Sequence, residues 1–356
     1  MNKTKTFILL LSSAALVGCA QSNVNKKAEA PTGTSVEQKV VDEKLAAAVT
    51  KMKETEALGI TVSGFATFDY EAENSTTYEG STESAKMSAN AKVSNLSIKA
   101  AATDIGKDTM KASASLSTDY TVKSSTTGTY SGATQQIDAS GKMSAKAYVA
   151  DKTVYVDATG MKDAVQKFGN SMGGSSVSIS IADADLKRKT TIANIADWNI
   201  ASAWEEIDSE IGEIKNYASK TEFLQGKNGT YSYLYTASAE KLISEIPGLG
   251  NMTGADGTKP TFNGEVKAWF TFTEDKFTEI GITSNASMKM EVKTDTNKMS
   301  ISGYSLPSMQ SETKLNVSLD GSFKVSFAYG DDVKVDSVEN PETYLDPSTS
   351  TNKVSA

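Results

Sequence analysis

The chain has 356 residues, of which 38% are apolar, and its 36 basic and 44 acidic side chains give a net charge of −8. This acidic balance argues against nucleic acid as a partner, because phosphate binding needs a basic surface. Histidine is absent and Cys19 is the single cysteine, which excludes Ser-His-Asp and Cys-His catalytic sites, thiolate metal clusters and an intramolecular disulfide. We therefore expect a protein that is not an enzyme and holds no cofactor or metal, with a hydrolase that uses carboxylates alone as the enzymatic alternative.

The N-terminus has the layout of a secretory signal. Lys3 and Lys5 precede the apolar run FILLLSSAALV at residues 7–17, and small residues follow it. A transmembrane helix needs roughly 20 apolar residues, so this run is too short to span a bilayer. We therefore predict that residues 1–18 are a signal peptide.

Cys19 closes the sequence LVGC at residues 16–19, which resembles the bacterial lipobox. The resemblance implies transfer of a diacylglyceryl group to Cys19, cleavage before it and, in some bacteria, acylation of the new N-terminus. It thereby implies a lipid anchor on the outer, extracytoplasmic face of the cell membrane. The alternative is an ordinary signal peptide with a chance cysteine. Residues 19–35 are mostly small and polar, which predicts a flexible lipidated tether.

A folded domain is predicted over residues 36–346. Apolar residues recur at three- and four-residue steps from Val36 to Met52, which predicts a helix, with Ser35 as N-cap and Gln38 completing a capping box. Two-residue alternation then predicts long strands over 60–70, 87–98, 110–116 and 141–160, with a β-bulge near Ser94 or Asn95 and a turn at 150–152. Helices are predicted over 161–172 and 201–217, with a hinge at 173–178 between two halves.

The second half continues the alternation. A strand with Tyr231, Tyr233 and Tyr235 leads into a short helix capped at Ser238. A long hairpin is predicted over 265–293, turned at 273–276, and a second hairpin over 313–330, turned at Asp320-Gly321. The tail, residues 347–356, is predicted to be disordered. The pattern indicates an α+β fold in which a large curved antiparallel sheet covers its apolar face with inserted helices. Whether the strands of 60–160 join the same sheet as the second half stays open.

Three stretches resemble a known family: residues 146–168 (KAYVADKTVYVDATGMKDAVQKF), 231–246 and 266–291. They are similar to the LolA/LprG-like half-barrel lipoproteins of the DUF6612 type, and the similarity covers most of residues 36–345, with residues 85–145 as the poorest fit. The resemblance implies an open barrel of about eleven strands that wraps helices around an apolar cavity. In characterised relatives such cavities hold acyl chains or lipidated cargo.

Aromatic and methionine side chains form candidate cavity walls, because methionine adapts to irregular apolar guests. The predicted ligand-cavity residues are Tyr235, Phe270, Phe272, Met288, Met290, Phe323 and Phe327. Packing of these side chains against the inserted helices is the favoured alternative.

Taken together, the sequence predicts a membrane-anchored, extracytoplasmic lipoprotein that binds or carries a lipid or another amphipathic ligand without catalysis. Its expected partners are the membrane, through Cys19, and a hydrophobic ligand. The alternative function is a structural or adhesive surface lipoprotein with a filled core.

Overall fold

A computed structural model describes residues 27–78, 80–128, 135–173, 180–192, 216–244, 257–295, 300–301, 304–305 and 309–346. The strands are β1 (Thr34–Ser35), β2 (Leu58–Tyr78), β3 (Ser81–Thr103), β4 (Lys111–Gly128), β5 (Gln135–Ala150), β6 (Thr153–Asp157), β7 (Lys187–Thr191), β8 (Lys220–Gln225), β9 (Tyr231–Ser238), β10 (Thr261–Phe272), β11 (Phe277–Asp295), β12 (Ser300–Ile301), β13 (Tyr304–Ser305) and β14 (Met309–Tyr329). The α-helices are α2 (Gln38–Met52), α3 (Lys162–Gly173) and α5 (Ala239–Ser244), and the 3-10 turns are η1 (Thr159–Met161), η3 (Asp183–Leu186), η5 (Lys227–Gly229), η7 (Gly330–Asp332) and η8 (Pro341–Thr343).

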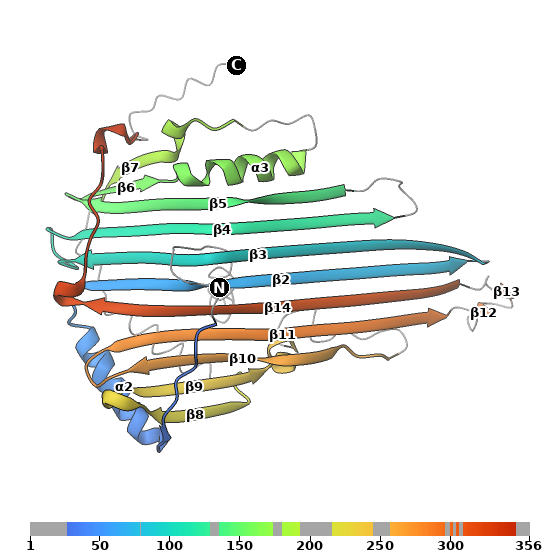
Figure 1. Cartoon of the computed structure of the whole chain (residues 1–356), viewed down its shortest axis with the longest axis horizontal. Coiled ribbons are helices and arrows are strands. Elements are labelled where there is room, and N and C mark those ends of the chain that lie inside the picture. The colour runs from blue at the N-terminus through green and yellow to red at the C-terminus, as the bar shows by residue number, and fades with distance from the viewer. Residues whose placement is uncertain are drawn as a thin grey trace.

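One large antiparallel sheet dominates the molecule (Figure 1). Its order is β1-β8-β9-β10-β11-β14-β2-β3-β4-β5-β6-β7, so the sheet is open, with β1 and β7 at opposite edges. Strand β14 pairs with β11 on one side and with β2 on the other. The two halves of the sequence therefore meet at β14 and form a single sheet. The prediction of a large antiparallel sheet is confirmed.

Alternation along the strands gives the sheet two chemically different faces. On one face, Leu319 of β14 lies opposite Phe68 of β2, and we call this the apolar face. On the other, Asp320 lies opposite Thr67, and we call this the polar face. Strands β11, β14 and β2 are paired without a register shift. Successive side chains of a strand point to opposite faces, so the same two faces extend across the centre of the sheet.

Helix α2 packs on the apolar face at the β8–β9 side, behind the strands in the view of Figure 1. Its buried residues are Val41, Leu45, Ala48, Val49 and Met52, which is the stripe that the sequence periodicity predicts. The helix begins at Gln38 after Glu37, which makes no side-chain capping bond. The predicted Ser35 cap is wrong, because Ser35 belongs to β1 and pairs with Leu224 of β8.

Two further helices pack against the sheet. In α3, Phe168 stacks on Tyr120 of β4 with ring centroids 5.4 Å apart, and Ala164 is buried with Ala139 of β5. Helix α5 follows β9 directly, and the backbone N–H of Lys241 donates to the Ser238 hydroxyl oxygen over 3.2 Å. The predicted Ser238 cap is therefore confirmed.

Two irregular backbone positions also match the sequence prediction. The pairing of β3 with β4 shifts register between Ser94 and Ser97, and Asn95 has a positive φ of 59°. This is the predicted β-bulge. Asp151 and Lys152 both have positive φ and join β5 to β6, as a two-residue hairpin turn requires.

The hairpin predicted at Asp320-Gly321 is wrong. Strand β14 runs without interruption from Met309 to Tyr329 and pairs with β2 over that whole length. Two neighbouring strands supply ladder hydrogen bonds on both sides of Asp320 and Gly321, so the long pairing overrides the local turn preference of this dipeptide.

Both terminal segments of the described chain cross the polar face. Residues 27–35 run over β14 towards β8 (Figure 1), where Lys27 pairs with Asp320 at 2.5 Å and the backbone N–H of Ala28 donates to the Ser322 hydroxyl over 2.7 Å. Ala28 and Ala30 also pack on a cluster that contains the fully buried Trp269. The predicted tether is therefore wrong for residues 27–35, because these residues are attached to the sheet.

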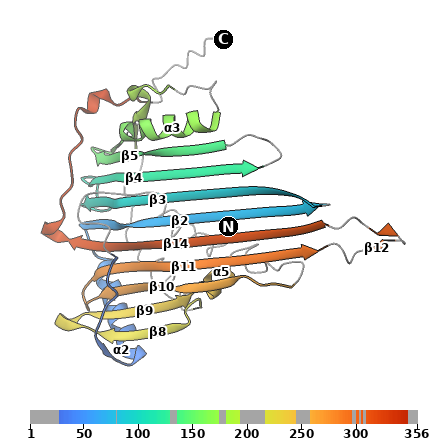
Figure 2. The same cartoon turned by 45° about the vertical axis from the view of Figure 1, so that its right-hand side comes forward.

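The C-terminal segment, residues 330–346, runs from the end of β14 to β7 along one end of the sheet (Figures 1 and 2). The backbone N–H of Asp336 donates to the Ser113 hydroxyl over 3.0 Å, and Leu345 bridges to Arg188 of β7. Tyr344 packs edge-on against Tyr155 with ring centroids 5.3 Å apart. The segment thus fastens the β7 edge to the rest of the sheet.

Asp157 at this edge carries a pH-dependent part of the stability. Burial by itself raises the pKa of Asp157, but hydrogen bonds from the Thr159 hydroxyl (2.6 Å) and backbone N–H (2.9 Å), together with Lys187, lower it below its ordinary value of 3.8. The folded-state pKa lies below the unfolded one, so the stabilisation is complete above pH 3.8 and is lost as the pH falls through the folded-state pKa.

We expect Asp157→Asn to lower the free energy of unfolding by about 1–2 kcal/mol at pH 7. The difference from the unsubstituted protein should shrink as the pH falls below 4, because protonation then removes the same charge. Urea unfolding at a series of pH values measures this. A difference that stays constant from pH 7 to pH 3 would contradict the assignment.

Several predicted features lie outside the described residues. These are the signal peptide 1–18, Cys19, the tether up to residue 26, residues 174–178 of the hinge, the helix predicted at 201–217 as far as residue 215, and the tail 347–356.

Candidate functional site

Large apolar side chains stand exposed on the apolar face of the central strands. Phe68 of β2 lies opposite Leu319 of β14, and further along the same two strands Tyr78 lies opposite Met309. Met87 of β3 lies opposite Ala72 of β2, between these two pairs. We call Phe68, Tyr78, Met87, Met309 and Leu319 the exposed apolar strip. The strip follows β2 for roughly 33 Å, at about 3.3 Å per residue.

The exposure of this strip is high for side chains of this kind. The exposed fractions are 40% for Phe68 and Leu319, 45% for Met87, 47% for Tyr78 and 37% for Met309. A single exposed apolar side chain on a surface needs no explanation, whereas several of them gathered on one face mark a site for a ligand, a membrane or another protein.

The polarity of the side chains beside the strip changes along its length. Around Phe68 its neighbours are apolar or small, with Tyr70 opposite Val317 and Ala91 opposite Phe68. Towards Tyr78 the same face carries Asn74 opposite Thr313, and the Asn74 side-chain oxygen accepts from the Ser311 hydroxyl over 3.4 Å. The face therefore offers an apolar part and a polar part in sequence, which suits an amphipathic molecule.

Helix-covered clusters flank the strip on the same face. On one side, α2 packs with Tyr233, Phe270 and Phe272. On the other side, α3 packs against β4 and β5 through Phe168 and Tyr120. The strip occupies strands β14, β2 and β3 between these clusters.

The seven residues predicted to line a ligand cavity lie on the apolar face but have different surroundings. Tyr235, Phe270 and Phe272 are buried in the cluster under α2, and Phe327 packs against it. Met288 is buried on β11, while Met290 and Phe323 are partly buried. For the four residues of the α2 cluster, the surroundings are those of helix packing, which is the alternative that the sequence favours.

Two tyrosines lie at the centre of that cluster. The rings of Tyr233 and Tyr235 stack with centroids 6.0 Å apart, and the Tyr233 hydroxyl donates to the Asp42 carboxylate of α2. The Tyr235 hydroxyl finds no hydrogen-bond partner in the described part of the chain. Burial, with the negative charge of Asp42 nearby, raises the pKa of Tyr235 above its ordinary value of 10. The Tyr235 phenol is therefore neutral at pH 7.

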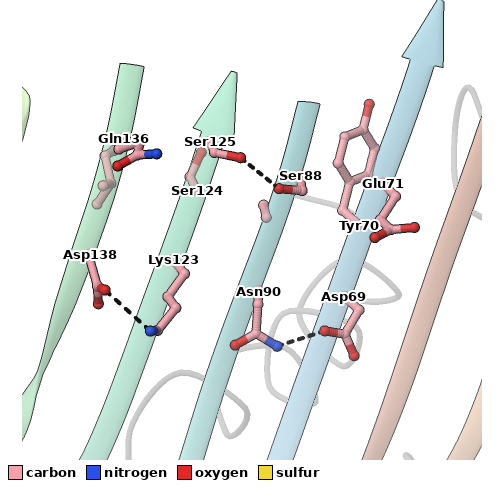
Figure 3. A pocket seen from close by; sticks show the side chains of 12 residues that line it. Asp69, Tyr70, Glu71, Ser88, Asn90, Lys123, Ser124, Ser125, Gln136 and Asp138 are labelled. Atoms are coloured by element: carbon pink, nitrogen blue, oxygen red, sulfur yellow. Dashed lines mark hydrogen bonds and ion pairs between the residues drawn. The ribbon is translucent and has the colours of Figure 1, made fainter. Parts of the chain in front are cut away.

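The polar face is hollowed over strands β2–β5, in a space of about 520 Å³ (Figure 3). Its side chains pair with one another across the strands. The Asn90 amide donates to Asp69 over 2.6 Å, Lys123 pairs with Asp138 at 3.2 Å, and the hydroxyls of Ser88 and Ser125 lie 2.9 Å apart. Each of these donors and acceptors is thus directed to a neighbour on the next strand.

The neighbouring carboxylates of Asp183 and Asp185 also have local partners. Asp183 pairs with Lys162 at 2.7 Å, and Asp185 pairs with Arg188 at 3.4 Å. Within the described ranges, no three Asp, Glu, Cys or His residues gather as metal ligands would. No helix in the same ranges is long and apolar enough to cross a membrane.

Sequence reasoning did not select the five strip residues as a site. Their alternation is visible in the sequence, but their exposure depends on which strands the helices leave open. The signal that was available is the length of the strands, since a sheet of 21- to 23-residue strands such as β2 and β3 exceeds what short helices can cover.

Comparison with known proteins gives no relative. No protein-family model and no curated protein matches the chain. Among solved structures, the outer membrane protein OprG from Pseudomonas aeruginosa is 8% identical over 77% of this chain and 98% of its own, with a TM-score of 0.16. The Salmonella injectisome secretin InvG is 8% identical over 81% of this chain and 68% of its own, with a TM-score of 0.19. A beta-barrel-like DUF1849 protein from Brucella abortus has a TM-score of 0.10 at 8% identity, over 71% of this chain and 97% of its own.

Proposed function

We propose that this protein is a lipid-anchored extracytoplasmic lipoprotein that binds an amphipathic ligand along the exposed apolar strip. The main observation in support of this proposal is the strip itself, in which Phe68, Leu319 and Met87 are 40–45% exposed on one face of an open sheet. Burying such surface under a ligand gains about 25 cal/mol per Å² of apolar area. The polar groups at Asn74 and Thr313 further along the face suit the head of a molecule whose tail lies on Phe68.

The finer fold proposal is a half-barrel of the LolA/LprG-like type, with helices α2 and α3 as inserted walls on the apolar face. Its support is the position of both helices on the face that carries the strip. In this proposal the domain begins before residue 36, because Thr34 and Ser35 pair with β8, and residues 173–178 do not separate two halves, because β7 pairs with β6.

The proposal includes no catalysis. Its support is chemical, because the sequence has no histidine and keeps one thiol, Cys19, for the anchor. Two carboxylates of the polar hollow, those of Asp69 and Asp138, are paired with Asn90 and Lys123. The alternative, a structural or adhesive lipoprotein without a small ligand, is supported by the tight packing of Phe270 and Phe272 under α2.

We expect a dansyl-labelled undecanoic acid to bind the Cys19→Ser chain saturably, with a rise in dansyl fluorescence. The double substitution Phe68→Glu/Leu319→Glu places two charges on the strip and should weaken binding about tenfold or more, because each charge must be desolvated under the acyl chain. Fluorescence titration gives the dissociation constant, and circular dichroism checks that the variant is folded.

The control is Asn316→Glu, which adds one such charge on the polar face of β14, three residues from Leu319. It should bind the probe as the unsubstituted chain does. If the double variant binds the probe as tightly as the unsubstituted chain, the exposed apolar strip is not the binding site. Absence of probe binding, together with native mass spectra free of co-purified lipid, would favour the structural alternative.

A further inference from the structure

We infer that the polar face of the sheet is the surface that the protein turns towards the membrane holding its anchor, so that the exposed apolar strip points away from that membrane. The inference rests on the proposed lipidation of Cys19. It adds the orientation of the molecule and the partner of its polar face, which is a hydrated lipid headgroup layer.

The first step is where the chain leaves the sheet. Lys27 is held by Asp320 at 2.5 Å, and the next residue, Ala28, donates its backbone N–H to Ser322 over 2.7 Å. Both partners are on the polar face of β14, the sixth of the twelve strands in the sheet order. Figure 1 shows residues 27–35 crossing the strands from β14 towards β8. The chain therefore leaves the domain near the centre of its polar face.

The second step is the reach of the remaining chain. Eight peptide units separate Cys19 from Lys27. A fully extended chain covers at most about 3.3–3.6 Å per residue, so Cys19 lies no more than roughly 26–29 Å from Lys27. This limit holds for any conformation of the intervening residues.

The third step is the path around the nearest edge. From Asp320 the register passes through Asn285 and Glu265 to Ser238 of β9, three strands away. Three strand spacings and the thickness of the sheet amount to roughly 24 Å. Helix α5, which starts directly after Ser238, packs against β9 and β10. The path around this edge takes up nearly the whole reach, so the linker can follow it only when it is almost fully extended.

The paths around the other edges of the sheet are longer. Along β14, nine residues separate Asp320 from Tyr329, which is about 30 Å, and the opposite end at Met309 is further away. Towards β7 the path crosses six strand spacings, about 29 Å, before it turns the edge. While residues 27–35 stay on the sheet, the anchored bilayer can thus meet the polar face with a relaxed linker, whereas it can approach the apolar side only around the β9 edge with the linker almost fully extended.

The chemistry of the polar face suits this partner. Lys, Asp, Glu, Ser and Asn side chains lie there, and several of them pair with neighbours, as in the Lys123–Asp138 and Asn90–Asp69 pairs. A surface of this kind remains hydrated beside headgroups without inserting. The ligand of the strip would then arrive from the aqueous side opposite the anchor.

The test places a single reactive thiol on either face of one strand in the full-length lipidated protein, where Cys19 is consumed by the anchor. Asn316→Cys labels the polar face of β14 and Leu319→Cys labels the apolar face. Each is coupled to a fluorescent donor, and the protein is reconstituted into phosphatidylcholine vesicles with rhodamine-labelled headgroups as acceptors. We expect at least twofold more efficient energy transfer from position 316 than from position 319.

Equal transfer from both positions, or more from 319, would overturn the orientation while leaving the anchor intact. Protein that does not associate with vesicles would refute the anchor and the orientation together, and ligand binding is judged separately by the dansyl titration. Insertion of twelve Gly/Ser residues after Asn23 is the control for reach. It should bring the two transfer efficiencies together, because a longer linker allows both faces to approach the membrane.

Discussion

Replacement of Trp269 by alanine is expected to lower the free energy of unfolding by about 3–5 kcal/mol, the range for a large aromatic side chain removed from a filled site. Trp269 is completely buried although it lies on the polar face, because Ala28 and Ala30 of the N-terminal segment cover it. Its indole N–H donates to Glu279 over 2.9 Å. The truncation leaves a cavity and removes one of two partners of Glu279, which also pairs with Lys324. Urea unfolding followed by circular dichroism measures the loss.

The control is Met87→Ala, which shortens a large side chain at a position that is 45% exposed. Its effect should stay within about 0.5 kcal/mol. A loss at Trp269 no larger than that of the control would contradict the packing described here. Gly281→Val tests the same site from the other side, because a Cβ at 281 would lie 2.0 Å from the Trp269 ring, and overpacking of this kind costs about 1–3 kcal/mol.

The second large effect concerns the anchor. We expect Cys19→Ser to move the protein from the membrane fraction to the soluble fraction, with a fall of about 100-fold or more in the membrane-bound share, because two or more acyl chains provide stable anchoring. Cell fractionation with a carbonate wash measures the share. Mass spectrometry of the N-terminal peptide should show a diacylglyceryl group on Cys19 in the unsubstituted protein.

Ser22→Ala is the control for this experiment, since it changes one hydroxyl three residues beyond the cysteine and leaves LVGC intact. It should remain lipidated and membrane-bound. Retention of the Cys19→Ser protein on carbonate-washed membranes would refute the anchor, and it would remove the basis of the orientation inferred above.

Much of the local structure is predictable because it depends on neighbours in the sequence. The stripe from Val41 to Met52 predicts the buried side of α2, and Asp151-Lys152 marks a turn between two alternating runs. The bulge at Asn95 is predictable for the same reason, because the alternating pattern changes face there. Periodicity reports which side chains share a face, and no other information is needed to predict these three elements.

The wrong predictions have a common cause. Asp320-Gly321 is a strong hairpin signal by itself, and Ser35 is a good N-cap by itself. In the folded chain each lies in a strand, and the ladder with β11 and β2, or with β8, is worth more than the local preference. The alternation of Leu319, Gly321 and Phe323 continues in phase through the dipeptide, which is the sequence feature consistent with one unbroken strand.

Composition and alternation are local properties, and they suffice to exclude histidine-dependent catalysis, to predict the anchor at Cys19 and to predict strands with one apolar and one polar face. The folded structure is needed to see that both halves share one sheet through β14, that Phe270 and Phe272 lie under α2, and that Phe68 and Leu319 stay exposed. It also shows that residues 27–35 cross the polar face. The reason is physical: exposure is set by which parts of a long sheet the few helices and terminal segments cover, and that depends on contacts between residues far apart in the chain.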